Sequence, residues 1–109
     1  MKLSVGRHPS VDADLREALA WYRAMDPDLA RRLRQETDRA VRRIAAYPRS
    51  ASHIFGDYRH VVLEHFPYMV VYRDLPNRVE LLAVFHLRRD PEPMRRELNG
   101  RCTARGHDR

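Results

Sequence analysis

The spacing of apolar residues in the first half of the chain predicts two helices. Apolar side chains recur at helical intervals across residues 11–25 and again across residues 29–47, which places them on one face of each helix. Ser10 precedes the first run as a candidate N-cap, and Asp-Pro-Asp at 26–28 joins the runs with a capping acid and a helix-starting proline. A joint this short predicts an antiparallel helical hairpin.

The second half of the chain changes to a period of two, which predicts strands. Residues 58–65, 68–75 and 78–87 follow this pattern and are separated by short turns that contain proline. Residues 1–7 alternate in the same way and predict a short N-terminal strand. The unbroken apolar middle of 78–87 indicates a central strand that is buried on both faces.

The C-terminal region predicts a short helix over residues 93–98, with Gly100 as its stop. Residues 101–109 lack periodicity and predict a flexible basic tail, so we expect one domain over residues 1–100. Truncation after Gly100 is then expected to shift the melting temperature by less than about 2 °C. The order of elements predicts an α+β fold, in which an N-terminal strand and a helical hairpin pack with a small, largely antiparallel sheet.

Composition adds a strong basic bias. The 109 residues carry a net charge of +6 with a pI near 10.2, and 20 of the 21 basic residues are arginine because Lys2 is the only lysine. A basic chain favours a polyanionic partner, such as nucleic acid, the ribosome or an acidic protein segment. A GC-rich genome would produce the same excess of arginine over lysine, so that preference alone does not indicate function.

The sequence favours a cytoplasmic protein with no membrane contact. No apolar run reaches the length of a membrane span, and the N-terminus lacks the apolar core of a signal peptide. Cys102 is the only cysteine and has no partner for an internal disulfide.

Three stretches together resemble the RelE/ParE superfamily of bacterial type II toxin–antitoxin modules. They read DADLREALAWYRAMDPDLARRL, FPYMVVYR and LLAVFHLRRDP, and the resemblance covers roughly residues 3–98. It implies a compact α+β toxin that inhibits growth and is neutralised by a cognate antitoxin encoded in the same operon, whose C-terminal segment wraps around it. The HLRRDP motif resembles the plasmid-stabilisation members of the ParE type.

The superfamily contains two activities, and single residues favour one of them. RelE-like members resemble ribosome-dependent mRNA endonucleases, which need a base, an acid and cations at the scissile phosphate. Arg59, His86 and Arg88 fit a metal-independent nuclease, but Met69 and Met94 stand near positions where active members carry an arginine and an aromatic residue. We therefore place the chain nearer the ParE branch, whose members resemble inhibitors of DNA gyrase.

Two alternatives stay open beside gyrase inhibition. One is the mRNA endonuclease, so the sequence leaves open whether the chain is an enzyme. The other is a non-catalytic protein that acts through antitoxin binding and autoregulation, and contacts operator DNA only through the antitoxin.

The candidate contact residues form two sets. The expected target-binding residues are Arg59, Tyr72, Arg73, His86, Arg88 and Arg89. The expected antitoxin-binding residues are Leu19, Trp21, Arg32 and Arg39. Each set has a simpler reading, because a charged strand end is often solvated surface and Trp21 lies beside an apolar helix face that could bury it.

No metal or cofactor is expected. His60, His65 and Cys102 lack the spacing of recognised zinc motifs. The sequence also lacks the GxSxG, P-loop and GxGxxG patterns of hydrolases and nucleotide-binding proteins.

Overall fold

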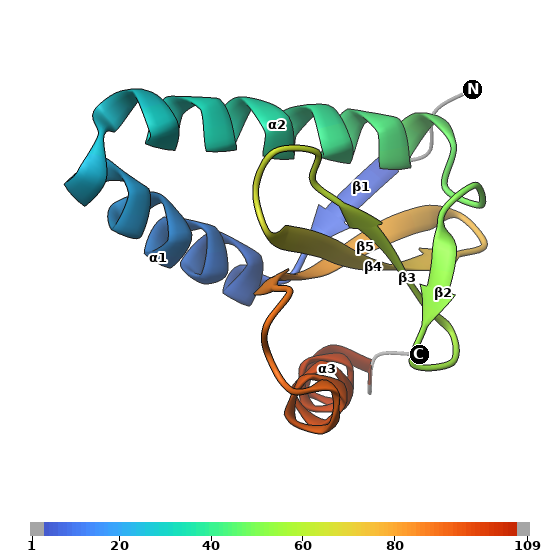
Figure 1. Cartoon of the computed structure of the whole chain (residues 1–109). Coiled ribbons are helices and arrows are strands. Elements are labelled where there is room, and N and C mark those ends of the chain that lie inside the picture. The colour runs from blue at the N-terminus through green and yellow to red at the C-terminus, as the bar shows by residue number, and fades with distance from the viewer. Residues whose placement is uncertain (1–3, 107–109) are drawn as a thin grey trace.

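The structure is a computed structural model that describes residues 4–106 (Figure 1). A five-stranded sheet has the order β1-β5-β4-β3-β2, in which only β1 and β5 pair in parallel. The strands are β1 (Ser4–Arg7), β2 (Ser52–Ile54), β3 (Tyr58–Val62), β4 (Tyr68–Leu75) and β5 (Arg78–His86). The predicted α+β fold with a largely antiparallel sheet is confirmed.

In the described part of the chain, three helices cover the two faces of this sheet. Helices α1 (Pro9–Met25) and α2 (Pro27–Ala46) form the predicted hairpin on one face, and α3 (Pro91–Gly106) lies on the opposite face (Figure 1). Within residues 4–106, no helix combines the length and the apolar character needed to cross a membrane.

The N-cap of α1 is His8, so the prediction of Ser10 is wrong. The backbone N–H of Ser10 donates to His8 Nδ1 at 3.0 Å, and Pro9 occupies the first helical position, where its missing N–H costs nothing. Asp26 caps α2 as predicted, since its Oδ1 accepts the N–H of Asp28 at 3.0 Å.

The core consists of two apolar clusters, one on each face of the sheet. On the hairpin face, Leu15 and Leu33 pack with sheet residues, and on the α3 face Met94 and Leu98 do the same. Strand β5 contributes to both clusters, which confirms the prediction of a strand buried on both faces. A bulge lies opposite the Val71–Tyr72 step of β4, where β5 places one extra residue into the ladder.

The β3–β4 connection is longer than predicted because its backbone is hydrogen-bonded to Glu36 on α2. Strand β3 ends at Val62, although the sequence pattern extended it to residue 65. The N–H groups of Glu64 and His65 both donate to Glu36 Oε1 on α2 at 3.1 Å, so they are not available to a strand partner.

The predicted end of the last helix is also wrong. Helix α3 continues through Gly100 to Gly106. Gly100 is therefore an interior residue of the helix, and a Cβ atom at this position would meet no atom within 4 Å. Arg101, which we had assigned to a flexible tail, is only 8% exposed. The rest of that prediction for residues 107–109 lies outside the described residues.

Candidate functional site

The end of β5 changes from buried to exposed within two residues. Phe85 is 1% exposed, His86 is half-buried, and Leu87 is 44% exposed. Arg88 is exposed and Arg89 is half-buried. We call residues 86–89 the strand-end surface.

Hydrogen bonds hold the strand-end surface in a fixed turn. The N–H of Arg88 donates to His86 Nδ1 at 3.0 Å, and the N–H of Arg89 points to the His86 carbonyl at 3.2 Å. The N–H of Leu87 donates to the Pro67 carbonyl at 2.9 Å, which links the turn to the loop before β4. Because Nδ1 accepts a hydrogen bond, the neutral imidazole of His86 carries its proton on Nε2.

Aromatic rings support His86 from the hairpin side. The ring of Tyr68, its cross-strand partner on β4, lies edge to face with the imidazole, with 5.0 Å between centroids. The ring of Tyr22 on α1 lies edge to face with the rings of Tyr68 and Phe66, with centroid distances of 6.3 and 5.2 Å, respectively. Burial raises the pKa of Tyr68, and nearby Tyr22 and Glu17 act in the same direction, so its hydroxyl stays protonated at neutral pH.

A groove of about 400 Å³ lies between α1 and the end of β5. Trp21 is 66% exposed at its edge, and Asp14 and Glu17 add negative charge on the α1 side. Arg89 adds a positive charge on the opposite side. This combination of exposed aromatic surface and opposite charges suits a protein partner better than a small molecule.

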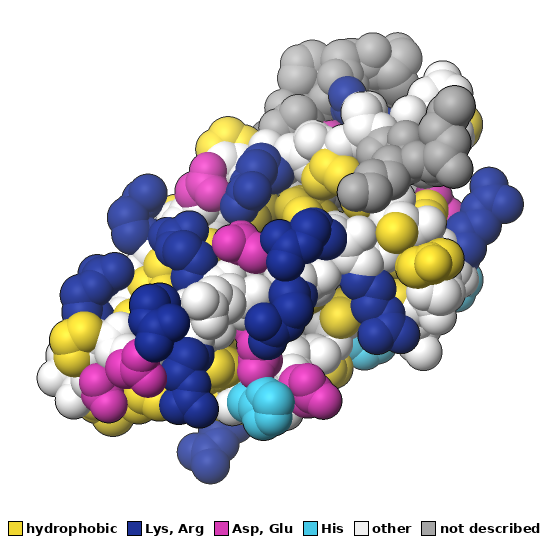
Figure 2. All heavy atoms as spheres, turned by 90° about the horizontal axis from the view of Figure 1, so that it is seen from above, with side chains coloured by type: hydrophobic (Ala, Val, Ile, Leu, Met, Phe, Trp, Pro, Cys, Tyr) yellow, Lys and Arg dark blue, Asp and Glu magenta, His cyan; other side chains and the backbone are white. Residues whose placement is uncertain are grey.

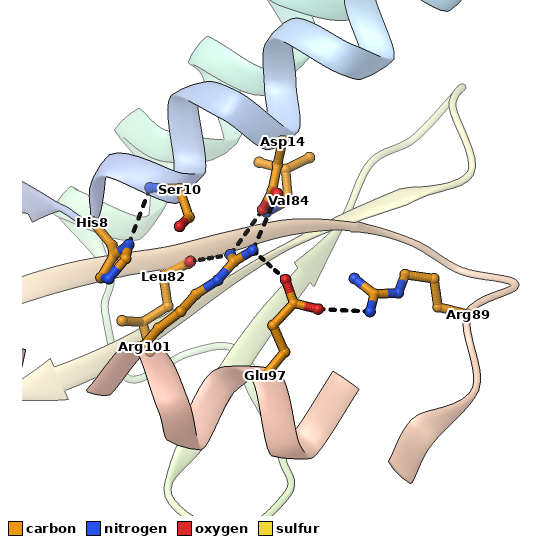
Figure 3. Close-up of polar contacts among 8 residues, drawn as sticks. All are labelled: His8, Ser10, Asp14, Leu82, Val84, Arg89, Glu97 and Arg101. Carbon is orange, nitrogen blue, oxygen red and sulfur yellow. Dashed lines mark hydrogen bonds and ion pairs between the residues drawn. The ribbon is translucent and has the colours of Figure 1, made fainter. Parts of the chain in front are cut away.

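An ion network that includes Asp14 and Arg89 of this groove reaches α3 (Figure 3). Arg101 on α3 donates to Asp14 at 2.9 and 3.2 Å and to Glu97 at 2.6 Å. Arg89 donates to the other oxygen of Glu97 at 2.7 Å, and its guanidinium lies 4.4 Å above the centre of the Phe85 ring. The network therefore connects α1, α3 and the strand-end surface.

The network shifts the pKa values of two of its members. Burial raises the pKa of Glu97, but its contacts with Arg89 and Arg101 outweigh burial and the net pKa is lowered. Burial lowers the pKa of Arg101, whereas Asp14 and Glu97 outweigh this effect and the net pKa is raised. Both groups are therefore charged at neutral pH.

Several predicted contact residues have structural roles instead. Tyr72 is fully buried and donates its hydroxyl to the Pro48 carbonyl. The side chain of Arg59 is 17% exposed and donates to the carbonyls of Ala51 and Arg49 at 2.7 and 3.2 Å. Burial removes Tyr72 from the surface available to a target, and Arg59 serves to position the start of β2.

The three residues proposed for a nuclease site do not come together. Arg59 lies opposite Tyr72, whereas His86 lies opposite Tyr68 on the other side of β4. Tyr68 and Tyr72 are four residues apart on β4, which corresponds to about 13 Å along the strand. His86 and Arg88 are adjacent, but Arg59 belongs to a different part of the sheet.

The remaining candidates divide between core and surface. Leu19 is 3% exposed and packs in the hairpin-face cluster, so it adds little to the surface of the toxin. Trp21 is exposed, which rules out the core reading, and Arg32 and Arg39 are exposed on α2. Arg73 is half-buried opposite Glu80.

The sequence reasoning missed Asp14, Glu97 and Arg101 as neighbours of the candidate site. The sequence predicts a flexible tail from residue 101, which includes Arg101, and no motif marks Asp14 or Glu97. The mixed charges on α3 were the available signal, but their partners lie on other elements. Among the described residues, no group of three His, Cys, Asp or Glu side chains is placed to hold a metal ion.

Comparisons with known proteins agree on one family. Residues 5–91 match the family described as the ParE toxin of the type II toxin–antitoxin system, parDE. The chain is 35% identical over 95 residues to Toxin ParE2 of Mycobacterium tuberculosis strain CDC 1551, covering 86% of this chain and 90% of the relative, with the same values for strain H37Rv. The fold is similar to a structure titled "Chromosomal ParDE TA system from P. aeruginosa", with a TM-score of 0.69, 19% identity, and coverage of 79% of this chain and 97% of the other. The chain therefore belongs to the ParE toxin family of type II toxin–antitoxin systems.

Proposed function

We propose that the toxin arrests growth by binding DNA gyrase, and that the strand-end surface makes the contact. Arg88 is the central residue of this proposal, flanked by His86 and Arg89. A planar guanidinium recognises carboxylates and phosphates through paired hydrogen bonds. Both kinds of group are available on an enzyme that handles DNA.

The observation that carries the proposal is the fixed backbone beneath an exposed arginine. Arg88 is exposed, yet its N–H is bound to His86 Nδ1 at 3.0 Å. The preceding residue is bound to the β3–β4 loop, and β5 itself is buried on both faces. A recognition residue on a rigid support loses less conformational entropy on binding than one on a free loop.

Neutralisation by an antitoxin from the same operon is the second part of the proposal. The family description names parDE, and the similar structure is titled as a ParDE system. Exposed Trp21 and the arginines of α2 provide apolar and basic surface for such a partner. A cytoplasmic module of this kind would stabilise a plasmid and contact its operator DNA through the antitoxin.

An mRNA endonuclease has less support. Arg59 donates to two backbone carbonyls and lies near Asp74 at 4.0 Å, so its charge is already engaged. Its separation from His86 leaves His86, Arg88 and Arg89 at the strand-end surface, and Arg89 is already bound to Glu97. We therefore do not assign a catalytic role to Arg59.

Purified Arg88→Ala toxin in a DNA supercoiling assay tests the gyrase proposal. Wild-type toxin should inhibit gyrase, and Arg88→Ala should lose inhibition while its melting temperature stays within about 2 °C. Arg96→Ala is the matched control, because Arg96 is an exposed arginine on α3 outside the strand-end surface. If gyrase is unaffected and induced cells stop translation before DNA replication, gyrase is the wrong target.

A further inference from the structure

The arginines at and after the strand-end surface are paired with acids, except for Arg88. Residues 86–97 contain four arginines and three acids, which leaves this segment with a single net positive charge. Three of the four arginines form ion pairs, and these pairs are Arg89–Glu97, Arg95–Glu92 and Arg96–Glu92. Within residues 4–106, no ion pair engages Arg88. The strand-end surface therefore presents one unpaired arginine.

The pairing of Arg89 is more fixed than that of an isolated surface ion pair. Its guanidinium donates to Glu97 at 2.7 Å and lies 4.4 Å from the centre of the Phe85 ring. The other oxygen of Glu97 accepts from Arg101 at 2.6 Å, so the acid bridges the two arginines (Figure 3). Isolated surface pairs contribute little, whereas charges in a network of good geometry hold one another in place. Glu97 therefore keeps Arg89 against the body of the protein.

The network around Glu97 carries no net formal charge. Asp14 and Glu97 supply two negative charges, and Arg89 and Arg101 supply two positive ones. A nucleic acid is attracted by the number of cations that can each replace a counterion at a phosphate. A neutral network adds little to this attraction, although two of its members are arginines.

The outer face of α2 has a different character. Figure 2 looks down on this helix and shows several Lys and Arg side chains gathered over it. In the described part of the chain, four exposed arginines of α2 take part in no ion pair, and these are Arg34, Arg39, Arg42 and Arg43. Neutralisation by acids is therefore a feature of the strand-end region and not of every basic surface of the toxin.

We propose that Glu97 is a specificity-determining residue, which neutralises Arg89 so that the strand-end surface binds an isolated carboxylate of a protein partner and not a chain of phosphates. Arg88 alone can form paired hydrogen bonds with one carboxylate. A phosphate chain is bound by several cations in succession, and Glu97 removes Arg89 from such a series. This inference rests on the proposed function, because it chooses between the two kinds of group that Arg88 could contact on gyrase.

The salt dependence of DNA binding measures the charge that Glu97 neutralises. The probe is a labelled duplex of about 20 base pairs, titrated with the full chain and followed by fluorescence anisotropy at about 50–200 mM salt. Glu97→Gln keeps the shape of the side chain and removes its charge. The slope of log K against log salt concentration should become steeper by about 0.9, which is the value for one further phosphate contact.

Further variants identify the released cation. Arg89→Ala added to Glu97→Gln should return the slope to the wild-type value. Arg89→Ala alone should change the slope by less than about 0.3, because this arginine is already neutralised. Asp57→Asn is the matched control, since it also removes one acid but, within residues 4–106, breaks no ion pair. Its slope should change by less than about 0.3.

Three results in the Glu97→Gln series would overturn the proposal. One is an unchanged slope, and another is a steeper slope that Arg89→Ala does not reverse. The third is an equal change in Asp57→Asn, which would show that net charge alone is the cause. If Glu97→Gln fails to fold, Arg89→Ala alone decides. A slope shallower by about 0.9 would then show that Arg89 already contacts phosphate and would overturn the proposal, whereas an unchanged slope supports it. Gyrase is absent from this assay, so a failure of the gyrase proposal is detected separately by supercoiling.

Discussion

Asp14 on α1 and Arg101 on α3 form a two-bond ion pair at the open edge of β5, although 87 positions separate them. Asp14 Oδ2 also accepts the N–H of Val84 at 3.0 Å, and Arg101 Nη1 donates to the Leu82 carbonyl at 2.7 Å. Strand β1 pairs with β5 only as far as Leu81. The ion pair therefore supplies the hydrogen bonds that a longer β1 would have made, and it makes α3 part of the body of the domain.

Replacing Arg101 with Leu should destabilise the toxin strongly. The change leaves Asp14 and the Leu82 carbonyl without this partner, and breaking a buried ion pair costs about 3–5 kcal/mol. For a domain of this size the melting temperature should fall by at least about 10 °C. Calorimetry provides the measurement, and Arg96→Ala, at an exposed position, should change stability by less than about 0.5 kcal/mol.

Truncation after Gly100 should have a similar effect, because it also removes Arg101. This expectation reverses the one drawn from the sequence, where residues 101–109 had no visible role. A melting temperature within about 2 °C of wild type for both Arg101→Leu and the truncation would contradict the role of the ion pair.

The fold was predictable where one period dominates a segment. The hairpin pattern and the alternation of β4 led to bounds that agree closely with the structure. Strand β2 was missed because its three residues are too short to show a period, and it exists through pairing with β3. The bulge in β5 was hidden because an unbroken apolar run looks the same with or without an extra residue.

The candidate site was predictable only in part, because its charges are matched across distant elements. The HLRRDP motif indicated the strand-end surface, and the structure shows Arg88 exposed there. No sequence pattern indicates that Arg59 is bound to two backbone carbonyls or that Tyr72 is buried. Those outcomes depend on which residues face each other across the sheet.

Glu36→Gln should destabilise the toxin at neutral pH and reduce its sensitivity to acid. Burial raises the pKa of Glu36, but the N–H groups of His65 and Glu64 and the His65 imidazole outweigh it, so the net pKa is below 4.5. A carboxylate with a lowered folded-state pKa stabilises the fold above its unfolded pKa, and this contribution is lost as pH falls through the folded value.

Urea denaturation at about pH 6.5 and about pH 3.5 measures this effect. At the higher pH, Glu36→Gln should lower the free energy of unfolding by about 1–3 kcal/mol. The difference between wild type and variant should shrink at the lower pH, because the stabilisation from a lowered folded-state pKa declines as pH falls below the unfolded-state pKa. Asp38→Asn, at an exposed position on the same helix, is the control. A difference that is the same at both pH values would show that the charge of Glu36 does not stabilise the loop.

The cap of α1 should distinguish between substitutions at position 8. His8→Ala removes the acceptor for the Ser10 N–H and should cost about 1 kcal/mol. His8→Asn should retain most of the stability, because an asparagine side-chain oxygen accepts the same kind of bond. Ser10→Ala, a change at the position first expected to cap the helix, should have the smaller effect in thermal unfolding. If Ser10→Ala lowers the stability more than His8→Ala does, the N-cap of α1 is Ser10 and not His8.

His86→Asn should separate the shape of the strand-end surface from its chemistry. The asparagine oxygen can accept the N–H of Arg88 in place of Nδ1, so the turn should be preserved, whereas no imidazole remains to move a proton. A toxin that acts by binding gyrase should keep supercoiling inhibition within a few-fold, and His86→Ala should lose more because the turn is released.

A nuclease that depends on His86 should lose on the order of 10²–10⁴-fold in rate with either change. Supercoiling and ribosome-dependent mRNA cleavage, measured side by side, give opposite outcomes for the two mechanisms. If the wild-type toxin cleaves mRNA and His86→Asn does not, the toxin acts by RNA cleavage and the gyrase proposal is wrong.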